Sequence, residues 1–107
     1  MREIRGRRRA LLTEIWTENG TYTDPLMAGK GYDEIDALIA AVHQRFPGFR
    51  FVRAGKVDGY RDYVRFSWKL GPEAGDSLVE GTDFAELDGD RIKAVNGFLD
   101  RVPNGAA

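Results

Sequence analysis

The sequence predicts an α+β fold, in which helices cover one face of a curved antiparallel sheet. Apolar residues recur at helical spacing in the first half of the chain and alternate with polar residues in the second half. Hairpin signals follow one another along the second half, which is typical of an antiparallel meander. With 107 residues, we expect one domain over 1–107, in which residues 1–6 form a frayed or atypical N-terminus.

Composition indicates an ordinary globular protein. The apolar share is 42% and the charged share is 31%, values that argue against a disordered chain. A net charge of -1 favours neither nucleic acid nor an anionic membrane, and no apolar run approaches the ~20 residues of a membrane span. The absence of cysteine removes disulfides, thiolate zinc sites and a cysteine nucleophile. We expect a cytoplasmic protein with no cofactor, metal, nucleic-acid partner or membrane partner.

A first helix is expected over about residues 7–18. Four apolar residues fall on one helical face: Leu11, Leu12, Ile15 and Trp16. Asn19-Gly20 would supply a left-handed C-terminal end. Five arginines crowd the first nine positions, either as an arm that binds nucleic acid or an acidic partner, or as a solvated helix end or frayed terminus. The second interpretation is favoured because no aromatic residues interleave with these arginines.

A second helix is expected over about residues 33–46. Asp33 and Asp36 stand in N-cap and N3-like positions, and Pro47-Gly48 ends the run. Its apolar residues recur at helical spacing: Ile35, Leu38, Ile39, Val42 and Phe46. Between the two helices, residues 21–23 are expected as an edge strand and residues 29–31 as a loop.

Four strands are expected after the second helix. In the first, Phe49, Phe51 and Val57 alternate with polar residues, and Asp58-Gly59 predicts a hairpin turn. The second strand has one apolar face, formed by Val64, Phe66, Trp68 and Leu70. After a loop over 71–77, a third strand covers about 78–87, and Asp88-Gly89-Asp90 turns it into a fourth over about 91–99.

Two aspartates are candidates for chemistry. Asp83 shares a strand face with small or apolar residues, so it lies either inside a cavity or on a solvated face, paired with Arg65 or Lys69. Burial would raise its pKa, and the acid could then donate a hydrogen bond or, when ionised, act as a base. Asp24 precedes Pro25, so its alternative role is an Asx-type turn. His43 is the only histidine, and we expect it at a helix surface or pocket rim.

The order of these features resembles the NTF2-like superfamily. The quoted motifs are Tyr22-Thr23-Asp24-Pro25 at the end of the segment 15–25, Gly81-Thr82-Asp83, and Asp88-Gly89-Asp90-Arg91-Ile92. They are similar to the SnoaL-like branch, relatives of ketosteroid isomerase and polyketide cyclases, over roughly residues 7–102. The resemblance implies a cone-shaped (cystatin-like) fold around a small-molecule pocket and a homodimer formed through the sheet. It also implies that the chain begins after the first helix of the family.

The resemblance implies roles for both acids. Asp24 matches the proton-moving acid of ketosteroid isomerase, and Asp83 matches the acid that helps hold the oxyanion. The tyrosine that the isomerase places on its first helix has no counterpart here. Limonene epoxide hydrolase chemistry is disfavoured because Arg65-Phe66-Ser67 lacks an acid and Gly97 stands where that family has its remaining aspartate. Scytalone dehydratase chemistry is disfavoured because that enzyme relies on more than one histidine.

Our leading hypothesis is a domain that binds a small apolar molecule, as an isomerase or cyclase that uses Asp24 as base and Asp83 as neutral donor. Its pocket would be lined by some of Trp16, Tyr22, Val42, Phe46, Phe66, Trp68 and Phe98. One alternative is a non-catalytic dimeric binding module. Another is a truncated chain whose missing arm is supplied by a swapped partner.

Overall fold

Two helices precede most of a six-stranded sheet in the computed structural model, which describes residues 2–103. The elements in chain order are α1 (Arg2–Ile15), β1 (Trp16–Thr23), β2 (Ala28–Lys30), α2 (Gly31–Arg45), β3 (Phe49–Tyr60), β4 (Tyr63–Pro72), β5 (Val79–Asp88) and β6 (Arg91–Arg101). The α+β class and the four-stranded meander are therefore as predicted. Residues 29–31, expected as a loop, instead contribute to β2 and to the first residue of α2.

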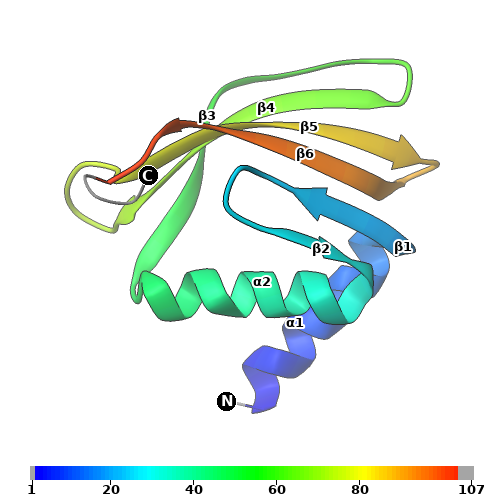
Figure 1. Ribbon diagram of the computed structural model, residues 1–107, viewed down its shortest axis with the longest axis horizontal. Coiled ribbons are helices and arrows are strands. Elements are labelled where there is room, and N and C mark those ends of the chain that lie inside the picture. The colour runs from blue at the N-terminus through cyan, green and yellow to red at the C-terminus, as the bar shows by residue number, and fades with distance from the viewer. Residues whose placement is uncertain (1, 104–107) are drawn as a thin grey trace.

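The strands are ordered β2-β1-β6-β5-β4-β3 (Figure 1). All neighbours are antiparallel except β1 and β6, which run parallel, so the sheet is mixed and not wholly antiparallel. β1 was expected as an edge strand, but it lies inside the sheet because β2 pairs with its free side. This position carries the end of β1, and with it Asp24, next to the centre of β6.

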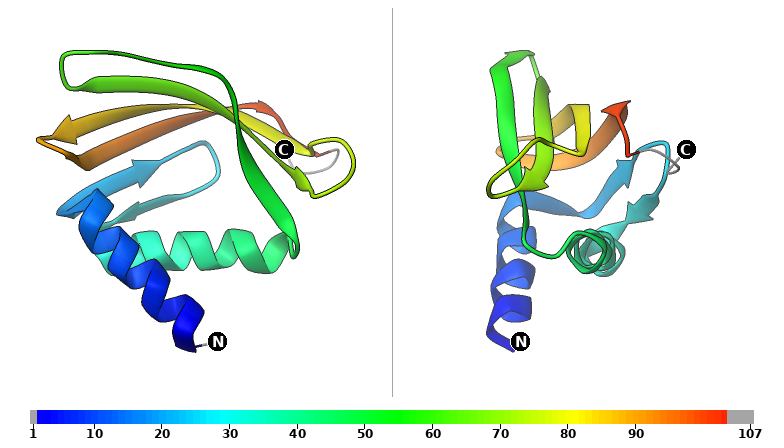
Figure 2. Two further views of the ribbon diagram at one scale, coloured as in Figure 1. Left: turned by 180° about the vertical axis from the view of Figure 1, so that it is seen from behind. Right: turned by 90° about the vertical axis from the view of Figure 1, so that its left-hand side faces the viewer.

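The sheet bends around α2, which lies across its concave side, and α1 crosses near one end of α2 (Figures 1 and 2). Two ion pairs join the helices, Arg8 with Asp36 and Arg9 with Asp33. The two acids expected to cap α2 therefore bind α1. The cap residue is Lys30, whose N–H donates to Glu34 Oε1 at 2.9 Å. Within the described residues, neither helix is long and apolar enough to cross a bilayer.

The junction of α1 and β1 differs from the prediction. α1 begins at Arg2 and ends at Ile15, and Trp16 begins a strand instead of completing the apolar face of the helix. Trp16 pairs with Ile92 on β6 and is buried. Gly20 does not end a helix; a Cβ at this position would lie 2.8 Å from the Trp16 ring. Pairing with β6 and burial of the indole thus override the helical spacing.

The turn between β3 and β4 is also displaced from its predicted position. β3 continues through Asp58-Gly59 to Tyr60, and the chain reverses at Arg61, whose φ is 52°. Asp58 lies opposite Arg65 on β4 and accepts a hydrogen bond from its guanidinium at 2.7 Å. An irregularity between Ala54 and Asp58 lengthens β3 relative to β4. The register of this hairpin is therefore fixed by the bulge and not by the Asp-Gly pair.

The buried core lies at one end of the molecule, where α1 and the start of α2 meet the sheet. Its buried members are Leu12, Trp16, Ile35, Ala85 and Val95. The other half of α2 faces the remaining part of the sheet across a cavity.

Candidate active site

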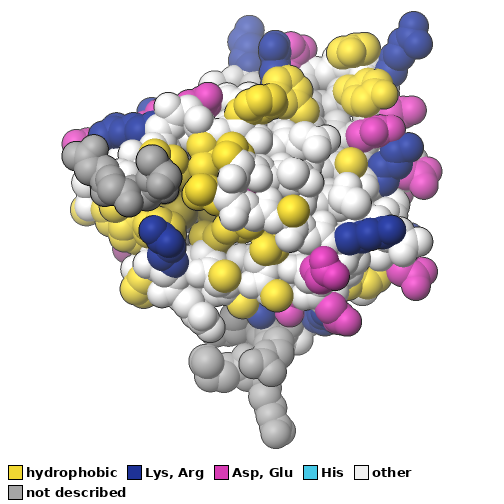
Figure 3. All heavy atoms as spheres, in the orientation of Figure 1, with side chains coloured by type: hydrophobic (Ala, Val, Ile, Leu, Met, Phe, Trp, Pro, Cys, Tyr) yellow, Lys and Arg dark blue, Asp and Glu magenta, His cyan; other side chains and the backbone are white. Residues whose placement is uncertain are grey.

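A cavity of about 930 Å³ lies between α2 and the concave face of the sheet. Its lining is mostly apolar, and the two candidate acids belong to it. In the space-filling view, hydrophobic side chains gather beside the C-terminal end of α2 (Figure 3). A cavity of this size is typical of sites for small organic molecules.

Six of the seven predicted pocket residues line this cavity: Trp16, Tyr22, Val42, Phe46, Phe66 and Trp68. Phe98 does not. It lies on the opposite face of the sheet, 59% exposed, where its ring meets that of Phe84 edge to face at 5.8 Å. The cause is a bulge at Lys93: Leu87 pairs with Ile92, but Glu86 pairs with Ala94. One extra residue in β6 exchanges the two faces of the strand from Ala94 to Leu99, where a second irregularity follows, so Leu99 lines the cavity instead.

Asp24 is held by its own turn. Its Oδ1 accepts hydrogen bonds from the backbone N–H groups of Leu26 at 2.7 Å and Met27 at 2.9 Å. Its backbone N–H donates to the carbonyl of Met27 at 2.9 Å. Its Oδ2 accepts the hydroxyl proton of Tyr22 at 2.7 Å. The Asx-type turn that the sequence allowed is therefore present, and it fixes the carboxyl at the cavity wall.

Asp83 lies in the centre of β5 with its side chain on the cavity side. It is 8% exposed and flanked on the same face by Gly81 and Ala85, which are buried too. The alternative pairing with Arg65 is not formed, since Arg65 binds Asp58. Among the described residues, Asp83 Oδ1 is buried without a hydrogen-bond partner.

Burial raises the pKa of the Asp83 carboxyl above its ordinary value. The indole N–H of Trp68 acts in the opposite direction, and the negative charge of Asp24 raises the pKa further. The indole does not complete a hydrogen bond with Asp83 in this geometry, because Trp68 Nε1 is also buried without a partner in the described part of the chain. Asp83 therefore keeps its proton to higher pH than a solvated aspartate does.

Gly97 brings the two acids together. It pairs with Asp83 across β5 and β6, and the end of β1 lies on its other side. A Cβ at Gly97 would lie 2.7 Å from Asp83 Oδ1, 3.3 Å from Asp24 Cβ and 3.5 Å from the Tyr22 hydroxyl. Two carboxyls and a phenol, from β5 and from the end of β1, thus converge on one position of β6 that only a glycine leaves open.

The Tyr22 hydroxyl remains a donor in this group. Burial raises its pKa, and its hydrogen bond to Asp24 and the charges of Asp24 and Asp83 raise it further. Tyr22 was predicted only as a pocket residue. Its link to Asp24 at i+2 depends on the turn after β1.

Several lining residues were not predicted. Leu26 and Met27 come from the turn after Asp24, and Leu99 comes from β6. Arg45 and Arg53 add two cations to the wall. Arg53 was detectable, since it continues the alternation of Phe49 and Phe51 on β3.

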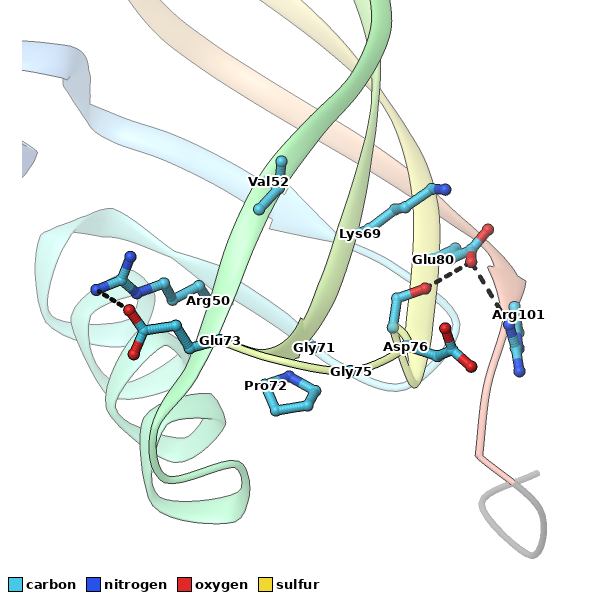
Figure 4. Close-up of a pocket in the computed structure, with 11 residues that line it drawn as sticks. Arg50, Val52, Lys69, Gly71, Pro72, Glu73, Gly75, Asp76, Glu80 and Arg101 are labelled. Carbon is cyan, nitrogen blue, oxygen red and sulfur yellow. Dashed lines mark hydrogen bonds and ion pairs between the residues drawn. The ribbon is translucent and has the colours of Figure 1, made fainter.

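A second hollow of about 550 Å³ lies beside the loop between β4 and β5 (Figure 4). Its charged groups neutralise one another: Arg50 lies 3.7 Å from Glu73, and Arg101 lies 3.7 Å from Glu80, which also accepts a hydrogen bond from Ser77. These groups are mostly exposed and leave no buried polar atom for a ligand to satisfy. The apolar cavity is therefore the better candidate.

No cluster of three or more potential metal-binding side chains occurs in the described part of the chain. His43 is exposed on α2 and is not a lining residue of either hollow.

Residues 1–95 match the family model of the SnoaL-like domain. No curated protein matches the chain. A solved structure of a candidate isomerase of the SnoaL-like family from Agrobacterium tumefaciens is 48% identical, with a TM-score of 0.85 over 90% of this chain and 83% of that one.

Two more distant structures share the fold. A candidate SnoaL-like polyketide cyclase from Jannaschia sp. CCS1 is 19% identical, with a TM-score of 0.70 over 86% of this chain and 72% of that one. A candidate ketosteroid isomerase from Kribbella flavida is 17% identical, with a TM-score of 0.69 over 96% of this chain and 73% of that one. The family model covers most of the chain, so the protein belongs to the SnoaL-like family.

Proposed function

We propose that the protein binds a small, largely apolar carbonyl compound in the cavity and moves a proton on it, as an isomerase or an aldol-type cyclase. The observation that carries this proposal is the convergence of Asp24 and Asp83 at one wall of an apolar cavity. Enolisation requires an ionised base and a hydrogen-bond donor, because one group removes a C–H proton while the other stabilises the oxyanion.

Asp24 is the base in this proposal. It removes a proton from the carbon next to the carbonyl group, and its turn and Tyr22 hold it in place. Asp83, whose pKa is raised by burial, is the neutral acid of this proposal and donates a hydrogen bond to the carbonyl oxygen as negative charge develops there. In an isomerisation Asp24 returns the proton to another carbon. In a cyclisation the enolate attacks a second carbonyl of the same molecule.

The relatives support this reaction class. The Agrobacterium protein is a candidate isomerase and the Jannaschia protein is a candidate polyketide cyclase. The proposed proton transfer is compatible with both descriptions.

A non-catalytic dimeric binding module is the second candidate. It is favoured by the exposed pair Phe84 and Phe98 on the outer face of the sheet, which is a surface suited to association. Such a module would bind ligands without exchanging their protons.

Exchange of carbon-bound protons with solvent deuterium tests the proposal without knowledge of the natural substrate. We expect the wild-type protein to catalyse deuterium uptake at the enolisable position of 2-tetralone. Proton NMR measures this uptake as loss of the corresponding proton signal. Asp24→Asn and Asp83→Asn should each slow this exchange by about 100-fold or more. Asp76→Asn, at an exposed loop position, is the matched control and should leave the rate unchanged. An equal rate of deuterium uptake in wild type and in a correctly folded Asp83→Asn variant would contradict the proposal.

A further inference from the structure

Arg53 occupies a position on β3 where the strand pattern calls for an apolar side chain. Phe49, Phe51 and Arg53 alternate along the same face, and Arg53 lies directly opposite Trp68, whose indole lines the cavity. Arg53 is itself a lining residue. A cation therefore stands on the concave side of the sheet at its β3 edge.

Arg45 also stands where the pattern calls for an apolar side chain, in this case on α2. Leu38, Val42 and Arg45 follow one another at helical spacing, and all three line the cavity. Arg45 is in the last turn of α2, and its guanidinium lies 5.7 Å from the centre of the Phe46 ring. The two walls of the cavity, helix and sheet, thus each contribute one cation.

Neither arginine is neutralised by a described side chain. Within residues 6–103, no acid lies within ion-pair distance of Arg45 or Arg53, whereas Arg8, Arg50 and Arg65 are all paired with carboxylates. Among the described residues that line the cavity, the acids are Asp24 and Asp83. Both Arg45 and Arg53 are exposed, so they lie where the cavity meets solvent.

The sheet sets the distance between the acids and the Arg53 cation. Asp83 is on β5 and Arg53 is on β3, with β4 between them. Two strand spacings amount to about 10 Å. Asp83 pairs with Phe66 and Arg53 pairs with Trp68, so the two backbones are also offset by two positions, about 7 Å, along β4. A ligand that reaches from Asp83 to Arg53 therefore spans about 12 Å between the two strands.

From this arrangement we propose that the ligand is an amphiphilic anion, with an apolar body in the cavity and an anionic group, such as a carboxylate, at the cavity rim that Arg45 and Arg53 line. The proposal rests on the proposed function for the carbonyl end only. The cations attract the charged end and the Asp24 carboxylate repels it, so the field of the site orients the molecule with its reactive carbonyl at Asp24 and Asp83.

The competing interpretation is that both arginines only cover apolar surface with their aliphatic stems while water solvates their guanidinium groups. Arg45 would also be favoured at the C-terminus of α2 by the helix dipole. These roles need no anion. They predict the same affinity for charged and neutral ligands of one shape.

A matched pair of fluorescent probes separates the two interpretations. Anilinonaphthalene sulfonate and N-phenylnaphthylamine share a ring system and differ by the sulfonate. We expect the wild-type protein to prefer the sulfonate in fluorescence titrations. Arg45→Gln and Arg53→Gln should each weaken sulfonate binding by about three- to fivefold, and the double variant by about tenfold, while binding of the neutral probe stays within about twofold. Raising the salt concentration should reduce the preference in wild type and not in the double variant.

Arg50→Gln is the matched control, because it makes the same change of charge on the same strand. Its side chain pairs with Glu73 at the second hollow (Figure 4), and Arg50 is not among the residues that line the apolar cavity. Arg53→Lys should retain most of the preference, and this variant keeps the test valid if the glutamine variants fold poorly by circular dichroism.

Three results would overturn the proposal: an unchanged preference in the double variant, an equal loss in Arg50→Gln, or no binding of either probe. Failure of the proposed function would look different. The preference for the sulfonate would then follow Arg45 and Arg53, but deuterium exchange into 2-tetralone would be the same with and without Asp83.

Discussion

At the scale of single residues, Asp83 shows how alternation alone places a polar group. Its neighbours two positions away on β5 are Gly81 and Ala85, and all three are buried on the cavity side. The sequence left open whether Arg65 or Lys69 would pair with this acid. The register answers the question: both basic residues lie on the opposite face of β4, where Arg65 meets Asp58.

Asp83 should make the stability of the protein depend on pH. Because burial raises its pKa in the folded state, the stabilising contribution of the neutral acid is fully present below its ordinary pKa of 3.8 and is lost as pH rises through the folded-state pKa. Asp83→Asn, which cannot ionise, should therefore be more stable than wild type at pH 8. The gain should be about 1.4 kcal/mol for each pH unit by which the folded-state pKa exceeds the ordinary one.

Urea unfolding at pH 4 and pH 8 measures this difference. The advantage of Asp83→Asn should shrink at pH 4, close to the ordinary pKa of 3.8, where the carboxyl is about half protonated even in the unfolded state. Asp76→Asn, at an exposed site, should show no such trend. An advantage that is the same at both pH values would mean that the carboxyl is not desolvated.

At the scale of elements, hydrophobic periodicity predicted both helices and the four meander strands but not β2, which was expected as a loop. Irregularities in the strands decided where their side chains point. The apolar face of β4 is as predicted, because no bulge interrupts its pairing with β5. β6 carries a bulge at Lys93, so the face expected for Phe98 belongs to Leu99. Bulges and the parallel pairing of β1 with β6 depend on residues distant in the sequence, and local pattern does not encode them.

Gly97 makes the proximity of the two acids possible, and this can be tested by adding one methyl group. In Gly97→Ala the new Cβ would lie 2.7 Å from Asp83 Oδ1, so the carboxyl must move. We expect a loss of about 1–3 kcal/mol in unfolding free energy, as for other overpacked sites. Deuterium exchange should fall about as far as in Asp83→Asn.

Gly6→Ala is the control for this change. A Cβ at Gly6 has no neighbour within 4 Å and lies in α1, so this variant should be as stable as wild type or more stable by about 0.5–1 kcal/mol. If Gly97→Ala exchanged deuterium at the wild-type rate, the two acids would not act at the position proposed.

At the scale of the whole molecule, the chain divides its apolar side chains between a core at one end and a cavity at the other. Among the described residues, no large side chain is fully buried, and aromatic rings such as Phe51 and Trp68 pack edge to face along the cavity wall. A domain of this size leaves part of its apolar surface open, and that surface is available to a ligand inside and to a partner outside.

The outer face of the sheet is the place where a second copy of the chain would pack. Phe84 and Phe98 are 42% and 59% exposed on β5 and β6, and they form one aromatic patch. The family resemblance implied a homodimer through the sheet, and the bulge at Lys93 is what directs Phe98 to this face. We therefore expect the protein to sediment as a dimer at micromolar concentration.

Replacement of both rings tests this proposal directly. Burying a large apolar side chain contributes about 1.5–3 kcal/mol, so the double variant Phe84→Ser/Phe98→Ser should weaken dimerisation by about a hundredfold or more and sediment as a monomer. Leu11→Ser removes a side chain that is 54% exposed on α1 and should leave the dimer intact. Because both phenylalanines lie on the opposite face of the sheet from the cavity, the monomeric variant should still bind N-phenylnaphthylamine. A dimer that survives loss of both rings would place the interface on another face, whereas a monomeric wild type would leave the aromatic patch without this role.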